Sequence, residues 1–283
     1  MRPNYAAPAP RGVARRTAFR SLLWLMAAFL AAVGAATGAQ PAQPKVRIVG
    51  YINVSSGCQT ETVKFLRDFA AKHRRDVHLE IVDFGSAAGQ RRWRADGYNC
   101  ETIVINGSNQ FQLGSGASAR IVVLKMPEGV RWTFSDLAAV LAQELRAPRS
   151  TILSDAAAKK VAQRKPVAWQ KGTWKGKPVG EVVVGAQTVF RFSGRFDGKS
   201  PVQRAQEAAA ILKRLYANKA GVGDVRVLRG VTKEGSPVGA VALGDEIVGV
   251  VTEPEAEIIN RPPQVAAQFW AFNLREALRL LGR

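Results

Sequence analysis

Cysteine and histidine are scarce in this chain, and their scarcity excludes several kinds of catalytic site. The 283 residues include two cysteines, Cys58 and Cys100, and two histidines, His73 and His78. A structural zinc site needs four protein ligands, and the histidines are expected at the end of a helix and on the next strand, away from Cys58. No Gly-x-Ser-x-Gly segment, which carries the nucleophile of many serine hydrolases, occurs in the sequence. We therefore predict no metal ion and no cofactor.

Acidic residues are also few. The chain has 22 Asp and Glu against 41 Lys and Arg, which gives a formal net charge of +19. Such an excess favours anionic partners. For an exported protein these are the anionic surfaces of the cell envelope more than nucleic acid, so no specific nucleic-acid binding is expected. A basic surface that only keeps the protein in solution fits the composition equally well.

Long apolar runs are confined to the N-terminus. The uncharged run 21–36 follows a group of arginines and precedes Thr37-Gly38-Ala39. This order predicts a signal peptide over residues 1–39, cleaved after Ala39, and a secreted or periplasmic protein. A folded-protein export signal is a second interpretation, and an uncleaved membrane anchor is a third, since residues 21–39 nearly reach the roughly 20 that span a bilayer. The arginines before the run are Arg11, Arg15, Arg16 and Arg20.

Residues 45–147 alternate between strand and helix patterns. A βα unit and a second strand are followed by a helix, two more strands and a last helix, which predicts a mixed sheet with right-handed helical crossovers. The predicted strands are 46–54, 77–82, 101–105 and 119–125, and the predicted helices run from Cys58 to about residue 72, over 87–95 and over 133–146.

This order of elements resembles the thioredoxin fold over residues 45–147. The resemblance also rests on Cys58 at the mouth of the first helix and on the loop 97–100 before the third strand. Thioredoxin-like oxidoreductases carry two cysteines separated by two residues at this helix mouth. Here Ser55 stands at the first place and Cys58 at the second, and Asn99 or Cys100 stands about where the family has a cis-proline. The resemblance implies a thioredoxin-like scaffold with a degenerate active-site motif.

The same resemblance implies that the two thiols are neighbours, because the loop before the third strand passes the mouth of the first helix. Cys58 and Cys100 would then form a disulfide, the state expected in an oxidising compartment. One interpretation is a structural link worth about 4 kcal/mol. The other is a redox-active bond, in which Cys58 attacks a partner disulfide and Cys100 resolves the mixed species.

Residues 148–180 are predicted to form a basic linker or docking arm. Cations interleaved with tryptophan suit lipid headgroups or an anionic polymer. The alternative is a solvated linker whose tryptophans fold back onto a neighbouring domain. The candidate residues for binding an anionic surface are Lys159, Lys160, Arg164, Lys165, Trp169, Lys171, Trp174, Lys175 and Lys177.

Residues 181–283 are predicted to form a small antiparallel α+β domain, so the fold class is α/β plus α+β. A helix opens at a capping box formed by Ser200 and Gln203, and a last helix follows Pro262-Pro263. The pattern is similar to a poorly characterised exported α+β module that can precede membrane channel domains, a similarity that assigns no site residues. The predicted strands are 181–184, 188–192, 225–228, 238–243 and 246–251.

These features predict an exported, thioredoxin-like protein with a binding or assembly role at the cell envelope. The expected partner is an anionic envelope surface or another exported protein, and peripheral contact with a membrane fits both. The alternative function is that of a thiol-disulfide oxidoreductase or redox sensor using Cys58 and Cys100.

The first prediction concerns the N-terminus. Natively produced protein should begin near Gln40 and be recovered outside the cytoplasm, because an apolar run behind arginines and ahead of small residues is a cleavable export signal. Mass spectrometry of the purified protein measures where it begins. An intact chain carrying residues 1–39 in the cytoplasmic fraction would contradict export.

Overall fold

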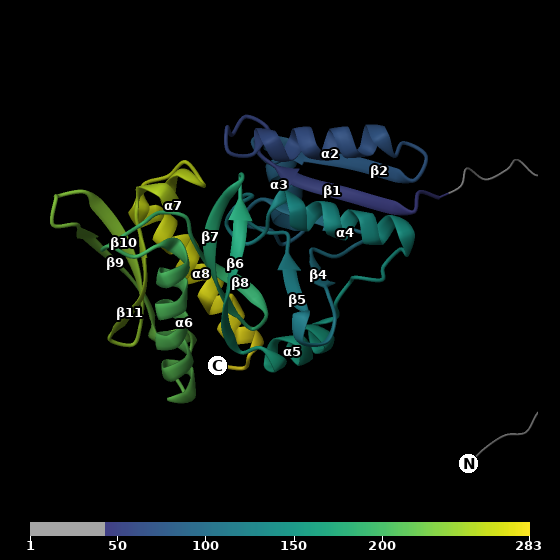
Figure 1. Cartoon of the computed structure of the whole chain (residues 1–283). Coiled ribbons are helices and arrows are strands. Elements are labelled where there is room, and N and C mark those ends of the chain that lie inside the picture. The colour runs from purple at the N-terminus through teal and green to yellow at the C-terminus, as the bar shows by residue number, and fades with distance from the viewer. Residues whose placement is uncertain (1–42) are drawn as a thin grey trace, which may run out of the picture. The chain divides into compact units, whose positions relative to one another are not determined.

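The computed structural model describes residues 43–283 (Figure 1). The predicted signal peptide, residues 1–39, lies outside the described residues. The described chain has mixed α/β content spread over several small sheets, and Pro44–Arg283 forms one compact unit. Within this part, no helix is both long enough and apolar enough to cross a membrane.

Strands and helices alternate in the N-terminal half largely as the sequence predicts. The strands are β1 (Val46–Ile52), β2 (Val77–Asp83), β3 (Thr102–Ile105), β4 (Gln110–Leu113) and β5 (Arg120–Val123). The helices are α2 (Thr60–Lys72), α3 (Ala87–Ala95) and α4 (Phe134–Arg146), with a 3-10 turn η1 (Gly116–Ser118). Strand β4 was not predicted, and it pairs with β5 as an antiparallel hairpin.

The first sheet has the strand order β2-β1-β3, with β1 parallel to β2 and antiparallel to β3. Strand β1 is central, and apart from the exposed Arg47 its residues are apolar on both faces, so helices cover it on both sides. Ile48 and Ile52 pack in one core cluster with Leu66 of α2 and Leu137 of α4. The opposite face of the sheet holds a smaller, aromatic cluster that includes Tyr51.

The segment 148–180 is not a linker. It contains α5 (Asp155–Arg164) and β6 (Val167–Trp174), and β6 pairs antiparallel with β7 (Lys177–Val184) along its whole length. Helix α5 is held because Ala158, Val161 and Ala162, spaced three and four residues apart, are buried in the main core. The lysines occupy the solvent side of both elements. The high charge of the segment therefore led to the prediction of a linker where a helix and a strand are formed.

The C-terminal part continues from β7 with three further strands, a 3-10 turn and three helices. They are β8 (Gln187–Phe192), α6 (Pro201–Ala217), η2 (Val222–Asp224), β9 (Val225–Val231), β10 (Pro237–Leu243), β11 (Glu246–Val251), α7 (Glu253–Glu257) and α8 (Pro263–Leu280). The capping box predicted at Ser200 and Gln203 is confirmed at the start of α6.

Residues 167–280 contain a structural repeat that the sequence did not suggest. Three antiparallel strands and a long helix occur twice, first as β6-β7-β8-α6 and then as β9-β10-β11-α8, and α7 is the one insertion. In each unit the second and third strands are joined by two residues, and the register shifts two residues before that turn. We call these stretches the first and second repeat units.

A glycine at the same place in each repeat unit holds the helix close to its sheet. A side chain on Gly180 would overlap the carbonyl oxygen of Pro201 at the start of α6, and one on Gly239 would overlap that of Pro263 at the start of α8. Both helices therefore begin directly on the middle strand of their own sheet, where only glycine leaves room.

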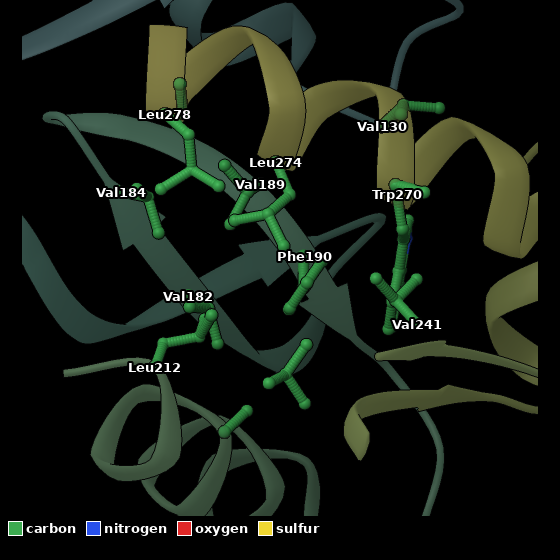
Figure 2. Close-up of a cluster of buried hydrophobic side chains, with 14 of the residues drawn as sticks. Val130, Val182, Val184, Val189, Phe190, Leu212, Val241, Trp270, Leu274 and Leu278 are labelled. Carbon is green, nitrogen blue, oxygen red and sulfur yellow. The ribbon is translucent and has the colours of Figure 1, made fainter. Parts of the chain in front are cut away.

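One core joins the two repeat units to the N-terminal half. Figure 2 shows side chains of α8 above the strands and Leu212 of α6 below them, near Val182. Ile121 and Val123 of β5 belong to the same cluster, and the Ile121 amide donates to the Ala186 carbonyl, 2.8 Å away, in the β7–β8 turn. The core thus crosses the boundary expected between two domains.

A buried ion pair holds the two repeat units together. Arg204 of α6 donates to the carboxylate of Glu255 in α7, at 2.9 Å, and to the carbonyl oxygens of Gly194 and Val250, at 2.6 Å each. The Glu255 carboxylate also accepts the amides of Gly194 and Thr252, at 2.9 Å each. Both charges are buried and make several hydrogen bonds. Removing one partner would leave the other as a buried charge without a counter-ion, which costs a large desolvation free energy.

The second prediction follows from this pair. Arg204→Met should lower the free energy of unfolding by about 3 to 5 kcal/mol, because Glu255 would remain as an uncompensated buried charge. Arg214→Met is the control on the same helix: Arg214 pairs with Glu246 at 2.5 Å, but both side chains are exposed, so its loss should cost less than about 1 kcal/mol. Urea unfolding of both variants measures the difference. Equal losses would show that burial does not set the strength of this pair.

Candidate functional site

The disulfide expected between Cys58 and Cys100 is not formed. Both cysteines are free thiols and they lie apart. Cys58 sits in the turn between β1 and α2, where its Sγ is 3.1 Å from the Ser56 hydroxyl, and α2 itself begins at Thr60. Ser55 is exposed in the same turn. The placement of the two thiols as neighbours, which the resemblance implies, is therefore wrong.

The two thiols do not meet because the loop before β3 directs Glu101, and not Cys100, toward α2. Successive residues of an extended chain point to opposite sides, and Glu101, not Cys100, is the residue that interacts with Thr62 of α2. Cys100 points the other way, toward α8, where it lines an apolar cavity of about 260 Å³ with Met126, Phe269 and other residues. Burial raises the pKa of the Cys100 thiol, which makes it a poorer nucleophile.

Glu101 is an unusual carboxylate. Its side chain is 2% exposed, and neither carboxylate oxygen has a hydrogen-bond partner among the described residues. Burial raises the pKa of Glu101 to about 8, and the side chain of Thr62 opposes this rise only in part. Sequence reasoning missed the residue because a single glutamate at the first position of a predicted strand, 101–105, resembles a solvated strand end.

The nine predicted anion-binding residues lie along α5, β6 and the β6–β7 turn. Lys159, Lys160 and Arg164 are exposed on α5, and Lys165 is half-buried where the helix ends. On β6 the side chains alternate, so that Trp169 and Lys171 are exposed and Trp174 is half-buried. Lys175 and Lys177 are exposed at the far end of the strand. We call these nine residues the basic band.

The basic band is extended rather than clustered. Its two ends are separated by the eight residues of β6, a distance of about 26 Å at the rise of a β-strand. None of its lysines or arginines belongs to an ion pair among residues 43–283. Their charges are therefore available to an external anion along the whole length of β6.

A polar cleft of about 710 Å³ opens at the far end of the basic band. One wall is formed by β6 and β7, with Lys171, Trp174 and Glu181, and the other by the start of α4 and the residues before it. The Lys175 ammonium lies 4.7 Å from the centre of the Trp174 ring, a favourable cation–π distance.

Cross-strand neighbours hold the carboxylate of Glu181 at the floor of the cleft. The Gln170 amide donates to it at 2.7 Å and the Arg191 guanidinium at 2.7 and 2.8 Å. Arg191 also donates to the Gly129 carbonyl of the loop before α4. This buried network neutralises Glu181 internally, so Glu181 adds little negative charge to the cleft.

A second carboxylate, Glu128, lies on the opposite wall. Its two oxygens accept the indole N–H of Trp174 at 3.1 and 3.2 Å. Burial raises the pKa of Glu128, and the Trp174 hydrogen bond lowers it in part. The ring of Trp174 lies directly over Gly129, which has φ of +90° and no room for a side chain. The cleft wall is therefore fixed by contacts that the sequence alone does not reveal.

Three cations line the cleft, namely Arg120, Lys171 and Lys175. Arg120 pairs with Asp136 at 2.5 Å, which leaves Lys171 and Lys175 as the cations of the cleft without an ion-pair partner in the described chain. Among residues 43–283, no three His, Cys, Asp or Glu side chains gather in a way that would hold a metal ion.

Comparison with known protein families gives a match for part of the chain. Residues 181–280 match a domain of unknown function (DUF8459). This range contains β8, α6 and the second repeat unit, whereas β6, which carries much of the basic band, precedes it. No curated protein and no solved structure matches the chain.

The third prediction concerns Glu101. The folded chain holds the Glu101 proton more tightly than the unfolded chain does. The contribution of this group to the free energy of unfolding is therefore fully present below the ordinary pKa of 4.5 and is lost as the pH rises through about 8. Glu101→Gln removes an unpaired buried charge, so it should stabilise the fold by about 1 to 3 kcal/mol at alkaline pH and have little effect at acidic pH.

Urea unfolding at about pH 5 and about pH 9 measures this difference. Glu61→Gln, at an exposed carboxylate of α2, is the matched control and should change neither value. An equal gain from Glu101→Gln at both pH values would contradict the titration of a buried carboxyl group.

Proposed function

We propose that the chain is an exported binding protein that attaches to anionic material of the cell envelope through the basic band. The observation that carries this proposal is that all seven cations of the band lack ion pairs in the described chain, and that six of them are exposed. Some exposed arginines elsewhere, such as Arg92, Arg214 and Arg226, are paired with a neighbouring acid, whereas others, such as Arg91 and Arg94, are not paired within the described chain. Unpaired cations keep their full attraction for an external anion.

The length of the band favours an extended ligand. A small anion would be held by groups that converge on one point, whereas the band spreads its cations over about 26 Å. A membrane leaflet or an anionic polymer engages such a row at many points, each cation near an anionic surface contributing about 1 kcal/mol.

The two tryptophans suit the same type of ligand. Trp169 is 39% exposed in the middle of the band, and large amphipathic rings favour the boundary between water and lipid headgroups. Trp174 holds Glu128 and supports Lys175, so it shapes the cleft at the end of the band. The cleft is then the place where an individual anionic group of the ligand is recognised.

We further propose that residues 45–147 are a thioredoxin-like scaffold without thioredoxin chemistry. The parallel β1–β2 pair, the antiparallel β3 and the order β2-β1-β3 support this assignment, as does α2 directly after β1. The scaffold provides β5 and the loop before α4, which form one wall of the cleft.

The fourth prediction tests the band. Replacing Lys159 and Lys160 by Ala should weaken binding to phosphatidylglycerol vesicles by about 2 kcal/mol. The Lys175→Ala, Lys177→Ala pair at the other end should have a similar effect. Co-sedimentation with vesicles at low and high salt measures the affinity, which should fall as salt screens the charges.

The control is a pair of exposed lysines outside the band, Lys213 and Lys219. Replacing both by Ala changes the net charge equally and should leave binding nearly unaltered. Binding to uncharged phosphatidylcholine vesicles with the same affinity, or an equal loss from the control pair, would contradict the proposal.

A further inference from the structure

Strand β6 is an open edge of its sheet. The strand order is β6-β7-β8, so β6 pairs with β7 on one side, and no strand of residues 43–283 pairs with it on the other. None of the eight residues of β6 is buried, whereas residues 179–184 of β7 and most of β8 are. An edge of this kind presents a row of unpaired backbone groups to which a further strand can be added.

The turn between β6 and β7 determines which residues carry these groups. In an antiparallel pair every second residue exchanges hydrogen bonds with its partner, and the two-residue turn makes Trp174 and Lys177 such a pair. The N–H and C=O groups of Trp169, Lys171 and Thr173 therefore point away from β7. No backbone group elsewhere in the described chain bonds to them.

The edge of β6 lacks most of the features that protect edge strands from pairing. Such strands are usually short, or they contain a proline or a bulge that bends the edge away. Strand β6 has eight residues without proline, which exceeds the typical strand length of about five or six, and its register with β7 is regular throughout. Its protection is Lys171, which opposes pairing with another basic edge because like charges on neighbouring strands repel.

The cations beside β6 favour an acidic partner strand. Lys171 lies in the middle of β6, Arg164 and Lys165 precede it and Lys175 follows it, while β6 itself contains no acidic residue. None of these four cations belongs to an ion pair among residues 43–283. Opposite charges on neighbouring strands attract. The charge that opposes a second copy of β6 therefore favours a strand that carries Asp or Glu.

The polar cleft of about 710 Å³ runs along this edge. Every residue in the range 170–176 lines it, although successive side chains of a strand point to opposite faces. The cleft therefore follows the backbone of β6 rather than one face of the sheet. Its other wall includes Thr133 and Ser135 at the start of α4, so a strand added to β6 would have hydroxyl groups beside it.

We propose that β6 accepts an extended acidic segment of a partner protein as a fourth strand of its sheet. Main-chain hydrogen bonds to Trp169, Lys171 and Thr173 hold the segment, and its acidic side chains meet the cations along β6. The inference rests on the proposed function for its charges, but not for its hydrogen bonds. An anionic surface requires the cations alone, whereas an added strand requires a peptide backbone.

Strand β9 provides a comparison, because it occupies the same place in the second repeat unit. It too is the first strand of its unit and an edge of its sheet. The carbonyl of Val225 in β9 already accepts Arg275 at 2.6 Å, and Arg226 is paired with Asp245 at 2.8 Å. The edge of β9 is therefore less open than that of β6, and it serves as the control edge.

Synthetic peptides test the pairing on the full chain. An eight-residue peptide of alternating Glu and Thr should bind in fluorescence anisotropy, and a peptide of alternating Lys and Thr should not. Two further forms, N-methylated on all glutamates or on all threonines, keep the charge of the first. Because only one of these sets faces β6, at least one form should bind about tenfold more weakly. Equal binding of the three acidic peptides would overturn the proposal.

A proline at the open edge tests the same hydrogen bonds from the side of the protein. Thr173→Pro removes an outward N–H, leaves the net charge unchanged and is tolerated at an edge, so it should weaken peptide binding about tenfold. Thr173→Ala, and Val231→Pro at the exposed end of β9, should leave binding unaltered. Circular dichroism confirms that each variant is folded. An unaltered affinity of Thr173→Pro, or an equal loss from Val231→Pro, would overturn the proposal.

Vesicle binding separates this inference from the proposed function. Thr173→Pro should bind phosphatidylglycerol vesicles as wild type does, because that attraction depends on charge. A chain that binds vesicles but not the acidic peptide would overturn the added strand and leave the anionic surface as the ligand. A chain that binds the unmethylated peptide but not vesicles would support the added strand and contradict a membrane as the ligand.

Discussion

The buried pair of Arg204 and Glu255 is the interaction on which the arrangement of the C-terminal part depends. Arg204 comes from the helix of the first repeat unit, while Glu255 and the Val250 carbonyl belong to the second. Amides after β8 donate to the same carboxylate. The pair therefore fixes the distance between the two sheets, and a shift of either unit would leave a charge without partners in a site where water does not reach it. This rigidity gives β6 a defined position relative to the second repeat unit.

The two repeat units have similar backbones but differ in a few side chains on one face of the sheet. Both units place a helix on the middle strand through a glycine, Gly180 or Gly239, and both have the same turn length. They differ on the opposite face, where Glu181 and Arg191 require hydrogen-bond partners and Ala240 and Val250 do not. A buried charge pair is stable only where the surrounding groups are fixed, and the loop at Gly129 provides them for the first unit alone.

Local patterns in the sequence were sufficient for most elements, and long-range contacts explain the failures. The capping box at Ser200 and the apolar stripe of α8 identify their helices because these signals depend on neighbouring residues only. The lysines of α5 concealed the small buried residues beneath them, so a helix and a strand were taken for a linker. The position of Cys100 depends on which way one residue of a loop points, and a shift of one position exchanges it with Glu101. The cleft was not predictable, since Glu128, Trp174 and Glu181 meet only through the tertiary fold.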